Sequence, residues 1–187
     1  LRQMIGMPDG FTGVIQDSAS SAILCAILTA RERATGWRVN EDGLGADDRL
    51  AVYTSTETHS STEKNVKIAG LGRQSLRKVP VDECYAMRVD ELERLILEDK
   101  ANGIVPACVV ASIGATGVGA IDPLRAIGEI CRRHGIFLHV DAAWAGSALV
   151  LEEHRWMIDG VELADSLVFN PHKWMMTNFD CSAHFVR

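Results

Sequence analysis

One lysine closely follows an apolar run, in the segment SLVFNPHKW at residues 166–174. Lys173 is expected to lose hydration among such neighbours, and desolvation favours the neutral form of an amine. A neutral amine attacks an aldehyde and forms a Schiff base. An isolated H-K pair is usually a surface lysine after a strand, so Lys173 gains weight as a nucleophile only beside a second chemical group.

That second group is Asp141, which ends another apolar run in HVDAAW at residues 139–144. A carboxylate that faces a pyridine nitrogen keeps it protonated through a charge-assisted hydrogen bond. The small residues that follow Asp141 leave room for a flat ring, whereas an isolated V-D would indicate an aspartate that caps a turn. An acid and a Schiff-base lysine are what pyridoxal phosphate (PLP) takes from a protein, so the pair predicts a PLP site.

Three further segments could complete this site. His59, in THSST, could stack on the cofactor ring and hold a substrate carboxylate, although alone it resembles a loop histidine before a helix. Ser18, Ala19 and Ser20 open a helix, where N–H groups and hydroxyls bind phosphate, and the same residue types also serve as plain caps. Thr116, in the glycine-rich GATG, could touch a ring substituent or simply belong to a turn.

Strand and helix signals alternate along the chain, which predicts an α/β fold with a mostly parallel sheet. Strands are expected at residues 50–54, 75–81, 104–112, 136–140, 166–169 and 182–186. Helices are expected at 18–33, 60–70, 90–100 and 122–134, with Asp90 and Asp122 as caps, and the first residues resemble a helix tail. Ligands collect outside the carboxyl ends of strands in open α/β sheets, which is where Thr116, Asp141 and Lys173 fall.

Composition excludes several other classes of protein. The 187 residues are 47% hydrophobic and carry a net charge of −6 without a basic patch, so no nucleic-acid partner is expected. No apolar run has the length that a bilayer needs, and no signal peptide is seen. Five cysteines without C-x-x-C spacing argue against a metal site and favour a reducing, cytoplasmic location.

Together, five motifs resemble the group II PLP-dependent amino-acid decarboxylases. They are VIQ-x-SAS at 14–20, THSS at 58–61, G-x-T at 114–116, HVDAAWAGS at 139–147 and NPHKW at 170–174, in the family's order. The resemblance implies the aspartate-aminotransferase-like fold (fold type I), with helices on both faces of a mostly parallel sheet. It also implies that residues 1–187 are most of the large PLP-binding domain. The chain begins at Leu1 and stops within an apolar run, so we expect a fragment without the N-terminal segment, the catalytic loop and the small C-terminal domain.

The resemblance assigns a role to each candidate residue. Lys173 resembles the Schiff-base lysine, Asp141 the partner of the pyridine nitrogen, and His59 the stacking histidine. The other cofactor contacts that it implies are Ala143 on the opposite ring face, Thr116 near the ring oxygen, and a phosphate grip of Ser18, Ala19, Ser20, Asn170 and His172.

The implied activity is PLP-dependent decarboxylation of an L-amino acid in a homodimer with the site at the subunit interface. NFDCSA at 178–183 and AGS after Trp144 resemble the aromatic and histidine branch, so an aromatic substrate is expected. Alternatives on the same scaffold are an aldehyde synthase and a decarboxylase of a non-aromatic amino acid. A non-catalytic dimerising relic is the alternative of another class.

Overall fold

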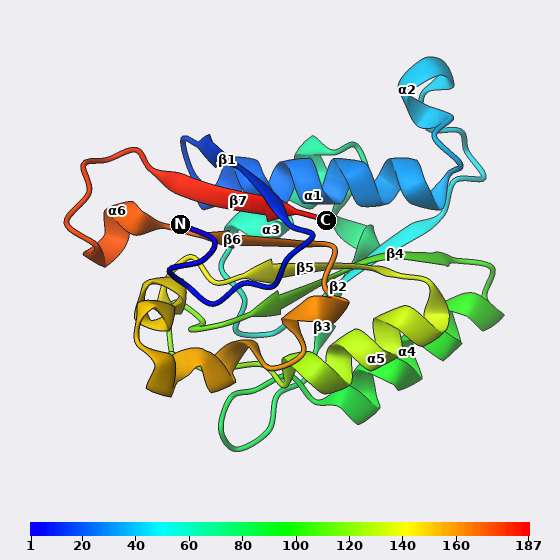
Figure 1. The fold of residues 1–187 in the computed structure, drawn as a ribbon. Helices are drawn as coiled ribbons and strands as arrows, with labels where there is room; N and C mark the ends of the chain where they lie inside the picture. Colours follow the sequence, from blue (N-terminus) through cyan, green and yellow to red (C-terminus); the bar gives the residue numbers. More distant parts are fainter.

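The computed structural model describes residues 1–187 and contains a seven-stranded sheet covered by helices on both faces (Figure 1). The order of strands in the sheet is β1-β7-β6-β5-β4-β2-β3, and β3, β2, β4, β5 and β6 run parallel. At the other edge, β7 runs antiparallel to both β6 and β1. The strands are β1 (Thr12–Gln16), β2 (Leu50–Ser55), β3 (Leu76–Val79), β4 (Val105–Ser112), β5 (Phe137–Asp141), β6 (Ser166–Phe169) and β7 (Ser182–Val186).

The helices divide between the two faces of the sheet. In Figure 1, α1 and α3 lie on one side and α4 and α5 on the other, so the expected layers are confirmed. The α-helices are α1 (Ala19–Ala34), α2 (Val39–Asp42), α3 (Ser61–Ile68), α4 (Val89–Ala101), α5 (Leu124–His134) and α6 (Pro171–Trp174). Short 3-10 helices are η1 (Arg73–Ser75), η2 (Ala145–Val150), η3 (Glu152–Ile158) and η4 (Val161–Leu163).

The side chains of β5 alternate between the two cores, and this alternation sets the direction of the Asp141 carboxylate. Leu138 and Val140 pack in the larger core, which includes residues of α4 and α5, whereas Phe137 packs in the smaller core with α1. Successive side chains of a strand point to opposite faces, so Asp141 lies on the same face as Phe137. The strand therefore presents its terminal carboxylate on the side where α1 begins.

Two predicted helix caps are not formed. The buried Asp122 carboxylate accepts the N–H groups of Met87 at 2.8 Å and Ser112 at 2.7 Å, which ties β4 to the segment before α4. Burial raises the pKa of Asp122 to about 6. Asp90 lies inside the first turn of α4 and pairs with Arg88. Asp122 thus holds two segments together, and Asp90 forms a local ion pair, where helix caps were predicted.

The N-terminal prediction is also corrected. Residues 2–6 form turns in place of the expected helix tail, and Ile5 is fully buried in the larger core. The edge strand β1 was not predicted, because four of its five residues are exposed and its side chains do not alternate.

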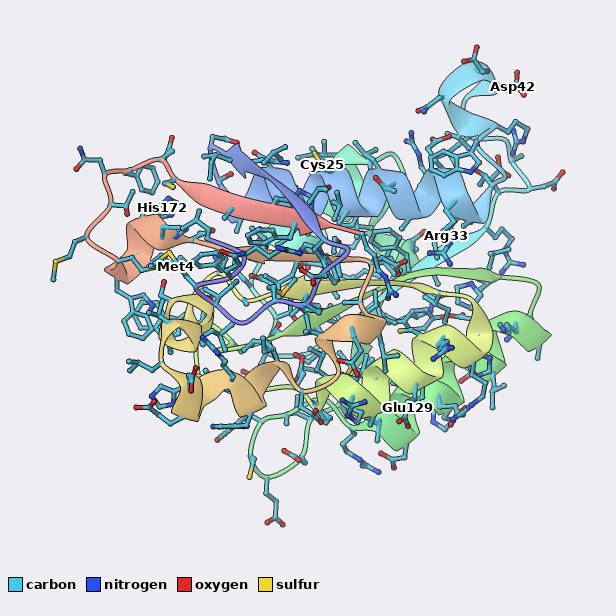
Figure 2. The ribbon with its side chains drawn as sticks, in the orientation of Figure 1. Met4, Cys25, Arg33, Asp42, Glu129 and His172 are labelled. Atoms are coloured by element: carbon cyan, nitrogen blue, oxygen red, sulfur yellow. The ribbon has the colours of Figure 1, made fainter.

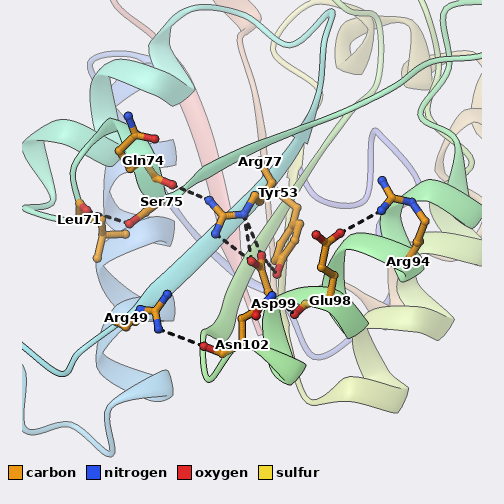
Figure 3. Close-up of polar contacts among 10 residues, drawn as sticks. All are labelled: Arg49, Tyr53, Leu71, Gln74, Ser75, Arg77, Arg94, Glu98, Asp99 and Asn102. Atoms are coloured by element: carbon orange, nitrogen blue, oxygen red, sulfur yellow. Dashed lines mark hydrogen bonds and ion pairs between the residues drawn. The ribbon is translucent and has the colours of Figure 1, made fainter.

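A buried polar cluster fastens β2, β3 and α4 together (Figure 3). The Tyr53 hydroxyl donates to Asp99 at 2.6 Å, and Arg77 donates to the same carboxylate from Nε at 2.9 Å and Nη2 at 2.8 Å. Burial raises the pKa of Tyr53 well above its ordinary value, so the phenol keeps its proton. The Asp99 carboxylate thus accepts hydrogen bonds from residues of two strands.

Replacing Asp99 by alanine is expected to lower the free energy of unfolding by about 3 kcal/mol, because the buried Tyr53 hydroxyl and Arg77 lose their partner. Urea denaturation of the full-length protein measures the loss. Glu98→Ala is the matched control, since Glu98 is exposed and its carboxylate pairs only with Arg94; its effect should stay below about 1 kcal/mol. Equal losses in the two variants would contradict the role of Asp99.

His139 is a second buried polar group, on β5 two residues before Asp141. Its Nδ1 lies 2.7 Å from the Ser166 hydroxyl, and its Nε2 has no partner. The ring meets that of His184 edge to face, with centroids 5.9 Å apart. Burial, and secondarily His184, lowers the pKa of His139 to about 3 from an ordinary 6.5. The folded protein therefore holds this imidazole neutral.

This neutral imidazole makes stability depend on pH. In the unfolded chain His139 binds a proton below pH 6.5, whereas in the folded chain it stays neutral down to about pH 3. The free energy of unfolding is therefore highest above pH 6.5 and decreases as the pH falls toward 3. Between pH 6.5 and 5 the loss from His139 is about 2 kcal/mol. Urea denaturation at pH 7 and 5 should therefore show a smaller difference for His139→Gln than for wild type, while the control His154→Gln keeps the full difference. Identical differences in all three proteins would exclude the effect.

Candidate active site

A cavity of about 220 Å³ lies at the carboxyl ends of the parallel strands. Its walls come from the start of α1, the β2–α3 connection, the segments after β4 and β5, and the β6–α6 junction. The lining residues are Ser18, Ala19, Ser20, His59, Ser61, Ser112, Gly114, Ala115, Thr116, Asp141, Ala143, Trp144, Asn170 and Lys173. Every predicted site residue except His172 is among them.

The start of α1 forms one wall. Ser18 caps the helix, and its hydroxyl oxygen accepts the N–H of Ser21 at 3.2 Å. The N–H groups of the first helical turn have no partner inside a helix, so those of Ala19 and Ser20 are available to a ligand. Asn65 of α3 donates to the Ser20 carbonyl at 2.7 Å and fixes this end of the helix. This wall is therefore built to receive an anion.

Asp141 stands at the end of β5 with one oxygen already engaged. Its Oδ1 accepts the N–H of Ala143 at 3.0 Å, which leaves Oδ2 for another partner. Desolvation raises the pKa of Asp141, partly opposed by the Ala143 N–H, the Lys173 amine and His59. A carboxylate in this environment is stabilised as an anion by a cationic partner.

His59 follows β2 and lies just before Ser60, the N-cap residue of α3. Its Nδ1 accepts the N–H of Ser61 at 3.2 Å and lies 2.8 Å from the Ser61 hydroxyl. Because a backbone N–H can only donate, Nδ1 must present its lone pair there, and the neutral ring carries its proton on Nε2. The loop histidine predicted near a helix start is thus bonded to the first residue of α3, and it also lines the cavity.

Thr116 lies in a tight loop after β4. Gly114 and Ala115 both donate to the Ala120 carbonyl, at 2.9 and 3.0 Å, which closes this loop. Gly114 has a positive φ of 83°, and a Cβ there would come within 2.7 Å of the Ala145 side chain. Glycine is therefore required on both counts, and it lets the loop approach the turn that follows Asp141.

The β6–α6 junction carries Asn170 and Lys173. Asn170 is buried, and its side-chain oxygen accepts the Ser182 hydroxyl at 2.8 Å, which leaves its amide N–H groups free. Lys173 is exposed in the structure, so the desolvation expected from its apolar neighbours is not seen. Lys173 nonetheless lines the same cavity as Asp141.

His172 is placed differently from its prediction. It lies at the α6 end of the molecule (Figure 2), and its Nδ1 accepts the N–H of Cys181 at 2.9 Å. Its ring packs on Phe179, with centroids 4.4 Å apart. In this structure the imidazole therefore supports the chain's return to β7 and does not line the cavity.

Sequence reasoning missed two hydroxyls and one aromatic residue that line the cavity. Ser61 falls in the helix predicted at 60–70 and Ser112 at the end of the strand predicted at 104–112, and neither these residues nor Trp144 was given a place in the site. The position of Ser112 at the carboxyl end of β4 was a usable signal, because ligands collect at such ends. Ser61 belongs to the THSS motif at 58–61, but its place on the cavity depends on how α3 packs on α1.

Two negative findings accompany the cavity. No group of three or more histidine, cysteine, aspartate or glutamate side chains is arranged to hold a metal ion. None of the helices combines the length and apolar character that a membrane span requires.

Comparisons with known proteins agree with the geometry. The model of the pyridoxal-dependent decarboxylase conserved domain matches residues 1–187. Phenylacetaldehyde synthase of Arabidopsis thaliana is 40% identical over 193 residues, which cover 99% of this chain and 39% of that protein. Histidine decarboxylase of Mus musculus is 42% identical over 203 residues, which cover 100% of this chain and 30% of that protein.

Solved structures confirm the fold. The crystal structure of Oryza sativa TDC with PLP and tryptamine superposes with a TM-score of 0.93 at 36% identity, covering 99% of this chain and 39% of that one. The chain thus spans less than half the length of the relatives that it matches. The family match covers the whole chain, and the resemblance seen in the motifs is confirmed: the chain belongs to the pyridoxal-dependent decarboxylase family.

Proposed function

We propose that this chain is the cofactor-binding domain of a PLP-dependent enzyme that decarboxylates an aromatic L-amino acid. The observation that carries the proposal is the presence of Lys173, Asp141 and the start of α1 around one cavity. An amine, an acid and an anion-binding helix end match the aldehyde, the ring nitrogen and the phosphate of PLP.

The residues present fit this cofactor. Ser18, Ala19 and Ser20, with the free amide N–H groups of Asn170, would hold the phosphate. Ala143, which is small and buried, and His59 would lie against the two ring faces, and Thr116 would reach the ring oxygen. His172, which was predicted in the phosphate grip, instead ties α6 to the start of β7 through Cys181.

When bound, PLP supplies an aldehyde for amines and a ring that takes up the electron pair left behind when a carboxylate departs as carbon dioxide. The chain's own groups prepare that step. Asp141 would hold a proton on the ring nitrogen through its free Oδ2, and the charge of that nitrogen would offset the desolvation of the carboxylate. His59, whose Nδ1 is engaged by Ser61, would have its Nε2–H available to donate to a substrate carboxylate.

We also propose a cytoplasmic homodimer with the site at the subunit interface. Supporting observations are the exposed Trp144 and Trp174 next to the cavity, because large apolar side chains at a surface favour association. All five cysteines are free, as suits a reducing compartment. Light scattering of the full-length protein tests the dimer, and a monomer with full activity would exclude it.

A panel of L-amino acids, supplied to the full-length protein with PLP, tests the activity. Release of carbon dioxide should be highest with an aromatic substrate. Carbon dioxide release with a non-aromatic substrate only would exclude the substrate class, and release with none would exclude the reaction.

An aldehyde synthase on the same scaffold is the second candidate, because a phenylacetaldehyde synthase is as similar to this chain as the decarboxylases are. The two activities share the loss of carbon dioxide and differ in the product. The same panel therefore separates them if amine and aldehyde are both measured: amine alone supports the decarboxylase, and aldehyde supports the synthase.

A further inference from the structure

Lys173 lies on a helix that cannot hold its own position. α6 has four residues, and a helix of this length is unstable in isolation because nucleation costs more than its few hydrogen bonds return. Two flanking residues, His172 and Trp174, make contacts outside the helix. The position of the lysine backbone therefore depends on contacts of its neighbours, among them those of His172 and Trp174.

On one side, His172 is bound to the strand that follows. Its N–H donates to the Cys181 carbonyl at 3.4 Å, and its Nδ1 accepts the Cys181 N–H at 2.9 Å. This pair ties α6 to the beginning of β7. These contacts do not reach the cavity, so they do not determine the distance between Lys173 and Asp141.

On the other side, Trp174 reaches across to the segment that carries the acid. Its indole Nε1–H donates to the carbonyl of Trp144 at 2.6 Å, and the two rings pack with centroids 5.7 Å apart. Trp144 lines the cavity and follows Asp141 by three residues. One side-chain hydrogen bond therefore links the residue after Lys173 to the turn after Asp141.

We propose that Trp174 is a positioning residue for Lys173. Its N–H sets the lysine-bearing turn at a fixed separation from the acid-bearing turn, so that the amine and the Asp141 carboxylate can engage opposite ends of one ring. This inference rests on the proposed function. It assigns to Trp174 a role in how firmly PLP is held, separate from any role in the stability of the fold.

Three variants of the full-length holoenzyme distinguish the effect of the Trp174 N–H from the effect of its aromatic ring. Trp174→Phe keeps an aromatic ring against Trp144 and removes the donor. Trp174→His loses the larger ring but keeps an N–H, because Nε2 of imidazole lies as many bonds from the backbone as Nε1 of indole. Trp156→Phe is the control, since Trp156 is exposed on η3 and lies outside the cavity.

The readouts are the dissociation constant of PLP, the pH midpoint of the visible absorbance of the bound cofactor, and the Tm of the cofactor-free protein. Trp174→Phe should weaken PLP binding by about tenfold, because binding must then order a turn that the hydrogen bond already holds in the cofactor-free protein, at a cost of about one hydrogen bond. It should also move the pH midpoint, while its cofactor-free Tm equals that of Trp156→Phe. Trp174→His should recover most of the PLP affinity.

Two results would overturn the inference. One is a PLP affinity and pH midpoint of Trp174→Phe equal to those of wild type. The other is a weakened affinity accompanied by a fall in the cofactor-free Tm that Trp156→Phe does not share, because Trp174 would then serve the fold alone. If wild type itself takes up no PLP at Lys173, the proposed function fails together with this inference, and the wild-type arm reveals that before any variant is compared.

Discussion

Lys173→Ala is expected to remove covalent uptake of PLP and to lower amino-acid turnover by roughly 10³-fold or more, because a positioned amine acts at a very high effective concentration. Lys173 is the only lysine that lines the cavity, so no neighbouring amine can replace it. Borohydride reduction followed by denaturation, with absorbance and turnover measured in the same preparation, checks both effects in the full-length protein.

Lys67→Ala is the matched control for this variant. Lys67 is an exposed lysine of α3 that pairs only with Glu63, so its loss should leave cofactor uptake and turnover unchanged. A Lys173→Ala protein that retains the cofactor chromophore after reduction and denaturation would show that another residue is the attachment point.

Asp141→Asn is the substitution with the second large expected effect on turnover. Asparagine has the same shape and can still accept the Ala143 N–H, but its other atom is a donor and cannot stabilise a protonated ring nitrogen. An adjacent carboxylate raises the pKa of such a nitrogen by about 1–3 units, so turnover should fall by roughly 10- to 10³-fold. PLP should still bind, because the lysine and the α1 wall remain.

Steady-state turnover and PLP titration of the full-length protein separate these two effects. Asp47→Asn, in the exposed loop before β2, controls for the loss of one negative charge. Undiminished turnover of Asp141→Asn would exclude a role in protonating the ring, and a complete loss of PLP binding would make Asp141 a structural residue of the site.

Much of the fold could be predicted from sequence where patterns are strong. The strands at 166–169 and 182–186 were predicted with their observed bounds, since both are short apolar runs between turn residues. The edge strand β1 was missed because its exposed residues give no alternation. All four 3-10 helices, η1 to η4, were missed as well, because turns of this kind depend on packing, as where Gly146 meets Phe169.

The site divides in the same way. Residues at strand ends, such as Asp141, could be placed because parallel strands deliver their carboxyl ends to one edge. The exposure of Lys173 and the contact of His172 with Cys181 could not be predicted, because both depend on the position of α6 and on the chain between α6 and β7. Asp122 was assigned as a cap from its neighbours in sequence, whereas its partners, Met87 and Ser112, come from other segments.

Peptide mapping after borohydride reduction tests the central claim most directly. The full-length protein is incubated with PLP, reduced, digested and analysed by mass spectrometry, which locates the pyridoxyl group on individual lysines. The proposed site predicts a single modified peptide that contains Lys173. Modification of a different lysine, or none after reduction, would contradict it.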